Sequence, residues 1–257
     1  MITCKLQGGI SNQMFQIAAT HALALRNNDL SGFDFNQCDT PNQGFTSHKY
    51  KNSILSRVDK ISVTDYTFRY IYNELKFSYD EIPYVPELIL NGYFQSEKYF
   101  VDYKKEILDL FRFDETTENK VGKYLQDNFT DKKVTSIHVR RGDYLSKPNF
   151  HPTLPMSYYN EAMRIIGESE FIIMSDDMEW VKENFKGENI HYSPFYEEME
   201  DMCLMMLCSN NIIANSSFSW WGAYLGKADV VLAPNLWFGP DGPKDTQDVI
   251  PNNWIKI

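Results

Sequence analysis

The chain has 257 residues, of which 43% are hydrophobic and 15% aromatic, and its formal net charge is −10 at pH 7. This length is enough for one large domain or two small ones, with a real apolar core. The negative charge argues against a nucleic-acid-binding protein, which needs a basic face to displace counterions. It does not exclude a small phosphate-bearing ligand, because that kind of site depends on local charge.

Neither a targeting segment nor a membrane-spanning segment is evident. Residues 1–6 lack a basic stretch followed by a long apolar one, and no apolar run approaches the length of a membrane span. We therefore expect a cytoplasmic protein, with a peripheral position at the inner membrane as the alternative. The four cysteines show no C-x-x-C spacing, which favours buried, reduced thiols over disulfides or a metal site.

The first half of the chain begins with a strand, a glycine turn and a helix. Alternating apolar residues predict the strand at 2–6, a pair of glycines predicts the turn, and an apolar face predicts a helix from about Gln13. Ser11 or Asn12 can cap this helix. Its free N–H groups suit an anionic ligand, although the turn is neither a Walker loop nor a dinucleotide-binding fingerprint.

The rest of the first half is less regular. Residues 31–87 scatter aromatic side chains among prolines and charges, which predicts short, irregular elements. Residues 88–94 predict a buried strand, and Ser96 can cap a helix over 97–111. A polar stretch over 114–133 then separates the two halves of the chain.

We expect an N-terminal domain over 1–130 and a C-terminal domain over 131–257. In the second domain, short apolar strands alternate with helices throughout, which indicates an α/β fold with a parallel, doubly wound sheet. The expected strands are 134–137, 171–174, 190–192, 212–214 and 230–233, and the expected helices are 155–166, 179–185, 197–208 and 218–225.

Three polar clusters, at 138–143, 175–177 and 215–219, follow strands of this sheet where each strand ends. Because parallel strands end at one edge of a sheet, and ligands bind at that edge, we expect the clusters to meet in one site. The guanidiniums of Arg140 and Arg141 can grip phosphate oxygens through paired, charge-assisted hydrogen bonds. The alternative is that they only pair with acids on a solvated loop.

The other two clusters have complementary chemistry. Ser216, Ser217 and Ser219 lie around a helix start and supply hydroxyls and backbone amides for phosphate oxygens, which is compatible with ordinary N-capping. Asp176 or Asp177 can accept hydrogen bonds from a base or ribose, or Asp176 can cap the next helix. These adjacent acids do not form a spaced metal-binding pair. We therefore expect no metal, with arginine and helix-end amides carrying the charge of a pyrophosphate.

Five motifs in this order carry a family resemblance, and they are residues 8–16, 92–100, 138–144, 175–177 with Trp180, and 215–222. Through them nearly the whole chain resembles the α1,2-fucosyltransferases of glycosyltransferase family 11. The resemblance implies a GT-B-like fold of two Rossmann-like domains. It also implies inverting, metal-independent transfer of fucose from GDP-fucose to the 2-hydroxyl of a galactoside. The first domain would serve the acceptor and the second the nucleotide sugar.

The resemblance also implies roles for single residues. Arg140 would bind the pyrophosphate, and His138 would contact the nucleoside. Asp143 is our candidate for the base that takes the acceptor's proton, unless a loose, oxocarbenium-like step needs little base help. The expected donor-binding residues are His138, Arg141, Asp177, Asn215, Ser216, Ser217, Phe218 and Ser219, with Asn12 and Gln13 near the fucose or the acceptor.

Two alternatives stay open. Another nucleotide-sugar transferase on the same fold would use a different sugar. A glycan-binding protein without catalysis would use the aromatic side chains and ignore the nucleotide.

Overall fold

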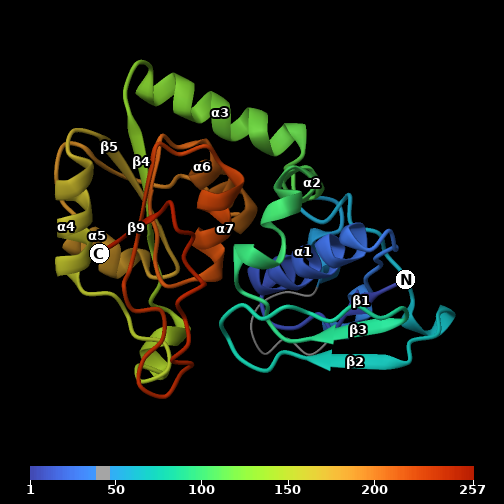
Figure 1. The fold of residues 1–257 in the computed structure, drawn as a ribbon. Helices are drawn as coiled ribbons and strands as arrows, with labels where there is room; N and C mark the ends of the chain where they lie inside the picture. Colours follow the sequence, from blue (N-terminus) through green and yellow to red (C-terminus); the bar gives the residue numbers. More distant parts are fainter. Residues whose placement is uncertain (39–46) are drawn as a thin grey trace. The chain divides into compact units, whose positions relative to one another are not determined.

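The computed structural model describes residues 1–38 and 47–257, and the chain forms two units (Figure 1). Unit 1 comprises Met1–Arg112 and Asp245–Pro251, and unit 2 comprises Phe113–Lys244 and Asn252–Ile257. The boundary expected after residue 130 differs from this division in two ways. Helix α3 (Glu115–Phe129) packs on unit 2, and the segment 245–251 returns to unit 1.

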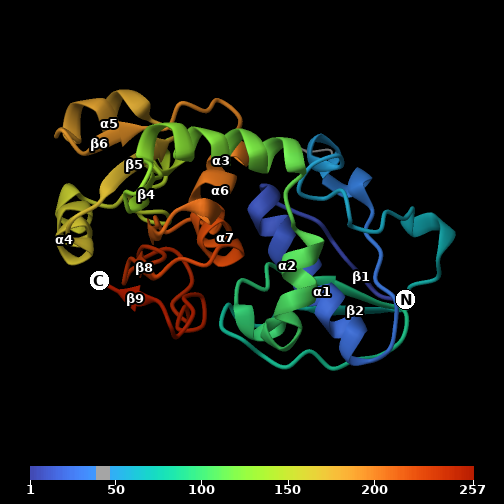
Figure 2. The same ribbon diagram turned by 90° about the horizontal axis from the view of Figure 1, so that it is seen from above.

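Unit 1 contains a sheet of three parallel strands, in the order β1 (Thr3–Cys4), β3 (Leu88–Asn91), β2 (Tyr70–Asn73). Helix α1 (Ile10–Arg26) packs against β1, and α2 (Lys104–Leu110) packs against α1 (Figure 2). The predicted apolar face of α1 is buried, but the helix is covered on its other sides as well, because every residue from 13 to 20 is buried.

Two helix predictions in unit 1 need correction. Helix α1 begins at Ile10, because Gly9 already has the extended conformation of an N-cap. Ser11 therefore lies inside the first turn, and neither it nor the following asparagine is the cap. The single helix expected over 97–111 is broken, because Phe100 leaves the helical conformation and buries its ring, so that 3₁₀ turns precede α2. Ser96 does cap the first of these turns, by accepting from the N–H of Lys98 at 3.3 Å.

The irregular region behaves largely as predicted where the structure describes it. It contains the 3₁₀ turns η1 (Phe35–Cys38), η2 (Ser47–Tyr50) and η3 (Val63–Asp65) besides β2. The part of this prediction that falls on 39–46 lies outside the described residues.

Unit 2 contains six parallel strands in the order β6-β5-β4-β7-β8-β9. The strands are β4 (Val134–Val139), β5 (Glu170–Ser175), β6 (Ile190–Tyr192), β7 (Asn210–Ile212), β8 (Val230–Ala233) and β9 (Ile255–Lys256). The helices between them are α4 (Met156–Ile166), α5 (Met178–Asn184), α6 (Glu198–Leu207) and α7 (Ser217–Leu225). The expected strands and helices are thus all present, within three residues at each end. Strand β9, two exposed residues long, was not predicted.

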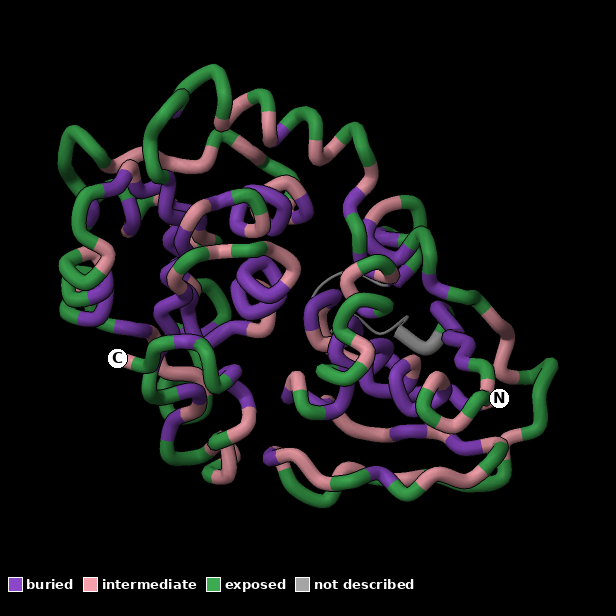
Figure 3. The backbone as a smooth tube through the Cα atoms, turned by 45° about the horizontal axis from the view of Figure 1, so that its top comes forward, coloured by how far each residue is buried: buried purple, intermediate pink, exposed green. Residues whose placement is uncertain are grey.

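Helices α4 and α5 cover one face of this sheet, and α6 and α7 cover the other (Figures 1 and 2). Every residue of β4 is buried, as expected for a central strand of a sheet covered on both faces. Figure 3 shows this contrast between the buried strands and the largely exposed α3. Because side chains alternate along a strand, Ile137 and Val139 join the core under α4 and α5, whereas His138 faces α7.

Cys4, Cys203 and Cys208 are buried and form no disulfide, as predicted, while the side chain of Cys38 lies outside the description. Among the helices of the described ranges, none is both long enough and apolar enough to cross a membrane.

Candidate functional site

The candidate site lies at the switch point of the sheet in unit 2. From β4 the chain runs outward to β5 and β6 on one side, and α6 then carries it back to β7 on the other side of β4. Ligands of open parallel sheets bind at the carboxyl ends of the strands beside such a point. The three polar clusters follow β5, β4 and β7, which are neighbours in the sheet, so the predicted convergence is confirmed.

The first part of the site is the arginine loop, which we define as residues 140–146. Arg140 donates through Nη2 to Asp143 Oδ1 at 2.6 Å, and its Nη1 forms an ion pair with Asp176 Oδ2 at 2.8 Å. Its side chain remains 34% exposed, and a guanidinium has more N–H donors than these two contacts use. Arg140 is therefore oriented by two carboxylates and still has donors for a ligand.

Arg141 has different surroundings. Its Nε donates to Asp177 Oδ2 at 2.9 Å, and its guanidinium lies 4.1 Å from the centre of the Trp180 ring. Only 17% of this side chain is exposed. The geometry makes Arg141 an anchor between β4 and α5, and its expected contact with the ligand stays a prediction.

Asp176 and Asp177 have separate tasks. Asp177 is the N-cap of α5 and accepts from the N–H of Trp180 at 3.2 Å, so the interpretation of Asp176 as the cap is wrong. Asp176 instead holds the arginine loop, because its Oδ1 accepts from the N–H of Arg141 at 2.9 Å while Oδ2 pairs with Arg140. Gly142 makes room for this carboxylate, since a Cβ there would lie 2.5 Å from Asp176 Oδ2.

The second part of the site is the serine loop, defined as residues 214–219, at the start of α7. Ser216 is the N-cap, and its hydroxyl accepts from the N–H of Phe218 at 3.3 Å. Ser219 is fully buried, and its Oγ accepts from the N–H of Ala214 at 3.2 Å. The loop is thus shaped by its own hydroxyls, and the start of α7 contributes the positive end of a helix dipole.

His138 borders both loops. Its ring lies 5.4 Å from that of Phe218, and its Nδ1 is buried without a hydrogen-bond partner. Burial, helped by the positive charge of Arg140, lowers the pKa of His138 to about 3, so the imidazole is neutral at pH 7. A buried polar atom without a partner is a point at which a ligand can bind.

Tyr144 joins the two loops, a role that its local sequence does not signal. Its hydroxyl donates to the backbone oxygen of Asn215 at 2.9 Å, and its ring lies 5.4 Å from the guanidinium carbon of Arg140. The side chain of Asn215 in turn donates to the backbone oxygens of Pro152 at 3.0 Å and Trp237 at 3.1 Å. The amide nitrogen of Asn215 therefore holds the loops beneath the site, and the expected contact of Asn215 with the ligand stays a prediction.

The two remaining candidates, Asn12 and Gln13, belong to unit 1, at the start of α1. Asn12 Oδ1 accepts from Gln95 Nε2 at 2.8 Å. Gln13 is fully buried, donates to the backbone oxygen of Gly8 at 2.8 Å and accepts from the Ser47 hydroxyl at 2.6 Å. The amide of Gln13 thus holds the glycine turn, and contact with a ligand stays a prediction.

Glu74 is a residue of unit 1 that the sequence did not single out. It follows β2 and accepts from the backbone N–H groups of Tyr93 at 2.7 Å and Phe94 at 2.8 Å. Phe94 has a φ of 53°, a left-handed conformation that costs energy for a bulky residue. Burial raises the pKa of Glu74. The carboxylate fixes the turn that follows β3 and precedes Gln95.

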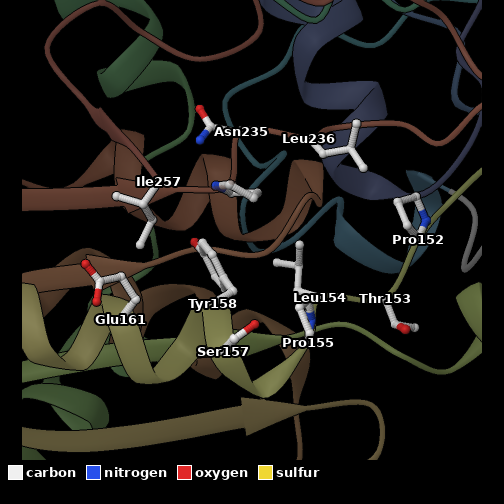
Figure 4. A pocket seen from close by; sticks show the side chains of 11 residues that line it. Pro152, Thr153, Leu154, Pro155, Ser157, Tyr158, Glu161, Asn235, Leu236 and Ile257 are labelled. Atoms are coloured by element: carbon white, nitrogen blue, oxygen red, sulfur yellow. The ribbon is translucent and has the colours of Figure 1, made fainter.

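A separate cavity of about 370 Å³ lies in unit 2 between the start of α4 and the segment after β8 (Figure 4). Its walls are mainly apolar, with Leu154, Tyr158, Leu236 and Ile257 among them. None of the predicted site residues lines it. Within the described ranges, no three side chains of metal-ligating types come together.

Solved fucosyltransferase structures share this fold. The crystal structure of NodZ α1,6-fucosyltransferase soaked with GDP-fucose is 12% identical, covers 91% of this chain and 95% of its own, and gives a TM-score of 0.58. The fold is therefore the GT-B-like fold of these enzymes, as the sequence predicts, with the polar site at the switch point of the second sheet.

Sequence relatives define the family. The model of glycosyl transferase family 11 matches residues 1–257. The O-antigen biosynthesis glycosyltransferase WbnK of Escherichia coli is 33% identical over the whole of both chains. An α-1,2-colitosyltransferase of Escherichia coli is 29% identical over all of this chain and 99% of its own. Galactoside α-(1,2)-fucosyltransferase 2 of Oryctolagus cuniculus is 24% identical over 95% of this chain and 72% of its own. The chain belongs to glycosyl transferase family 11 and is a glycosyltransferase.

Proposed function

We propose that the protein transfers L-fucose from GDP-β-L-fucose to the 2-hydroxyl of a galactoside, with inversion and without a metal. The observation that carries the proposal is the pairing of two anion-binding elements at one switch point. Arg140 follows β4, and the start of α7 follows β7, the next strand in the sheet. A diphosphate needs such donors on more than one side.

The chemistry follows from charge. When the bond between fucose and phosphate breaks, GDP leaves with one more negative charge than it had in the donor. A guanidinium and helix-end amides fixed in place interact more strongly with that charge as it develops, which lowers the barrier. The carboxylates of Asp143 and Asp176 hold Arg140 in a single orientation, so that little reorganisation is needed during the reaction.

The remaining parts of the donor would use the neighbouring groups. His138 is neutral and offers a buried nitrogen without a partner, which suits the nucleoside better than a second phosphate contact. Phe218 and Ser217 are partly exposed beside it and would cover the phosphate side. Asp143 is 47% exposed and is the candidate to receive the acceptor's proton, and unit 1 would supply the acceptor contacts.

A second candidate donor is the nucleotide-activated form of colitose, which is fucose without its 3-hydroxyl. The specific observation is the end-to-end similarity to an α-1,2-colitosyltransferase. The same diphosphate-binding residues would serve both donors, because the two sugars differ only at a hydroxyl remote from the leaving group.

The test is a comparison of donors with the purified 257-residue chain. Release of the nucleoside diphosphate is measured with GDP-fucose, GDP-colitose, GDP-mannose and UDP-galactose, and a panel of galactosides is then screened by mass spectrometry. The linkage and the anomeric configuration of the product are read by NMR. We expect GDP-fucose to be turned over and an α1,2-linked product to form. Failure to bind GDP in calorimetry, or turnover with UDP-galactose alone, would contradict the proposal.

A further inference from the structure

Tyr144 touches both anion-binding elements of the site. Its hydroxyl donates to the backbone oxygen of Asn215 at 2.9 Å, and Asn215 directly precedes Ser216, the N-cap of α7. Its ring lies beneath the guanidinium of Arg140, which favours a cation–π contact. One side chain therefore links the arginine loop to the serine loop across 71 residues of sequence.

The two ends of this link are themselves held in place. The ring of His151 stacks on that of Tyr144, with 4.6 Å between their centres and 14° between their planes. Asn215 cannot turn its amide around, because Oδ1 would then face the carbonyl oxygens of Pro152 and Trp237 that Nδ2 now binds. Tyr144 is 8% exposed, so its bonds are shielded from competing water.

We propose that Tyr144 is a positioning residue that keeps Arg140 and the start of α7 at a fixed separation, so that both act on the departing diphosphate together. This inference rests on the proposed function. Donors on two independent loops would have to be ordered separately during the reaction, whereas donors on linked loops are already in place. The linked donors stabilise the negative charge that develops as the sugar leaves. Loss of the link should therefore lower kcat more than it weakens donor binding.

The chain contains a matched control for this hydroxyl. Tyr158 on α4 is 9% exposed, and its hydroxyl donates to the backbone oxygens of Ile213 at 2.6 Å and Leu232 at 3.3 Å. Tyr158→Phe thus removes a buried tyrosine hydroxyl bonded near the same strand end, and these bonds do not involve the arginine loop. A loss of general stability would appear equally in both variants.

The experiment compares Tyr144→Phe with Tyr158→Phe in the 257-residue chain. We expect similar shifts of the urea midpoint, but only Tyr144→Phe should lower kcat, by about three- to tenfold, the range for one hydrogen bond. Its KM for GDP-fucose should stay within about twofold of the wild-type value. In the double variant Tyr144→Phe/Ser216→Ala, kcat should fall by less than the product of the two single effects, because both changes loosen the same loop at the start of α7.

A second measurement uses no ligand. Hydrogen–deuterium exchange of the amides in 216–219 should accelerate in Tyr144→Phe and stay at the wild-type rate in Tyr158→Phe. Equal kcat and equal exchange in the two variants would overturn the inference. If the wild-type chain neither binds GDP nor releases it from GDP-fucose, the proposed function fails. The exchange rates would then still decide whether Tyr144 links the loops.

Discussion

Replacement of Arg140 is the most direct test of the site. Alanine removes the guanidinium and leaves Asp143 and Asp176, its partners at 2.6 and 2.8 Å, without a cation beside the proposed position of the diphosphate. Loss of one preorganised electrostatic donor costs about 10² to 10³ in kcat. Two uncompensated carboxylates add repulsion, so we expect Arg140→Ala to lie at the upper end of that range.

The Arg140→Lys variant keeps the positive charge at this position but removes the planar guanidinium, so it tests the contribution of geometry alone. One ammonium group cannot span both carboxylates and also reach a phosphate, so we expect Arg140→Lys to lose about tenfold in kcat although the charge is kept. The assay is GDP release from GDP-fucose at saturating donor, with GDP binding measured by calorimetry. Arg164→Ala is the matched control, since Arg164 is 71% exposed on α4, pairs with Glu161, and its loss changes the net charge equally. Wild-type turnover in Arg140→Lys would refute our account of the site.

Three further predictions use the same purified chain. Gly142→Ala should lower the free energy of unfolding by about 1–3 kcal/mol in urea, because its Cβ would meet the pinned carboxylate of Asp176. Gly122→Ala, whose Cβ meets nothing within 4 Å, should not destabilise, and equal losses would contradict the steric argument. The lowered pKa of His138 means that its contribution to stability is complete above pH 6.5 and is lost as the pH falls toward 3. His138→Gln should therefore flatten the fall in unfolding free energy below pH 6.5 by about 1.4 kcal/mol per pH unit, and an unchanged slope would argue against this. Asp143→Asn should lower kcat and remove the acidic limb of the pH–rate profile, and an unaltered profile with unaltered kcat would exclude Asp143 as the base.

The sheet of unit 2 was readable from the sequence because its signals are local. The alternation of β-branched and polar residues at 134–137, followed by arginines and glycine, indicates a strand and its end without reference to any partner. The alternation of such strands with helices then places the polar residues at one edge by topology alone. The prediction of one helix over 97–111 was wrong because the deciding interaction is not local. Burial of the Phe100 ring in the core overrides the helical preference of the sequence.

The pairing within the site required the structure. The sequence offered two arginines and two aspartates but did not indicate that Asp176 holds Arg140 while Asp177 caps α5 and binds Arg141. Identical charges on adjacent residues have no local pattern that distinguishes them. The direction in which each side chain points depends on where β5 ends relative to β4.

The sequence by itself determined the class of fold, the strand ends that carry the polar residues, and the family motifs. Only the tertiary structure decided the return of 245–251 to unit 1, the turn that Glu74 fixes, and the link between Tyr144 and Asn215. The reason is physical. Periodicity records which side of an element is buried, whereas a hydrogen bond between residues 71 positions apart depends on how whole elements pack.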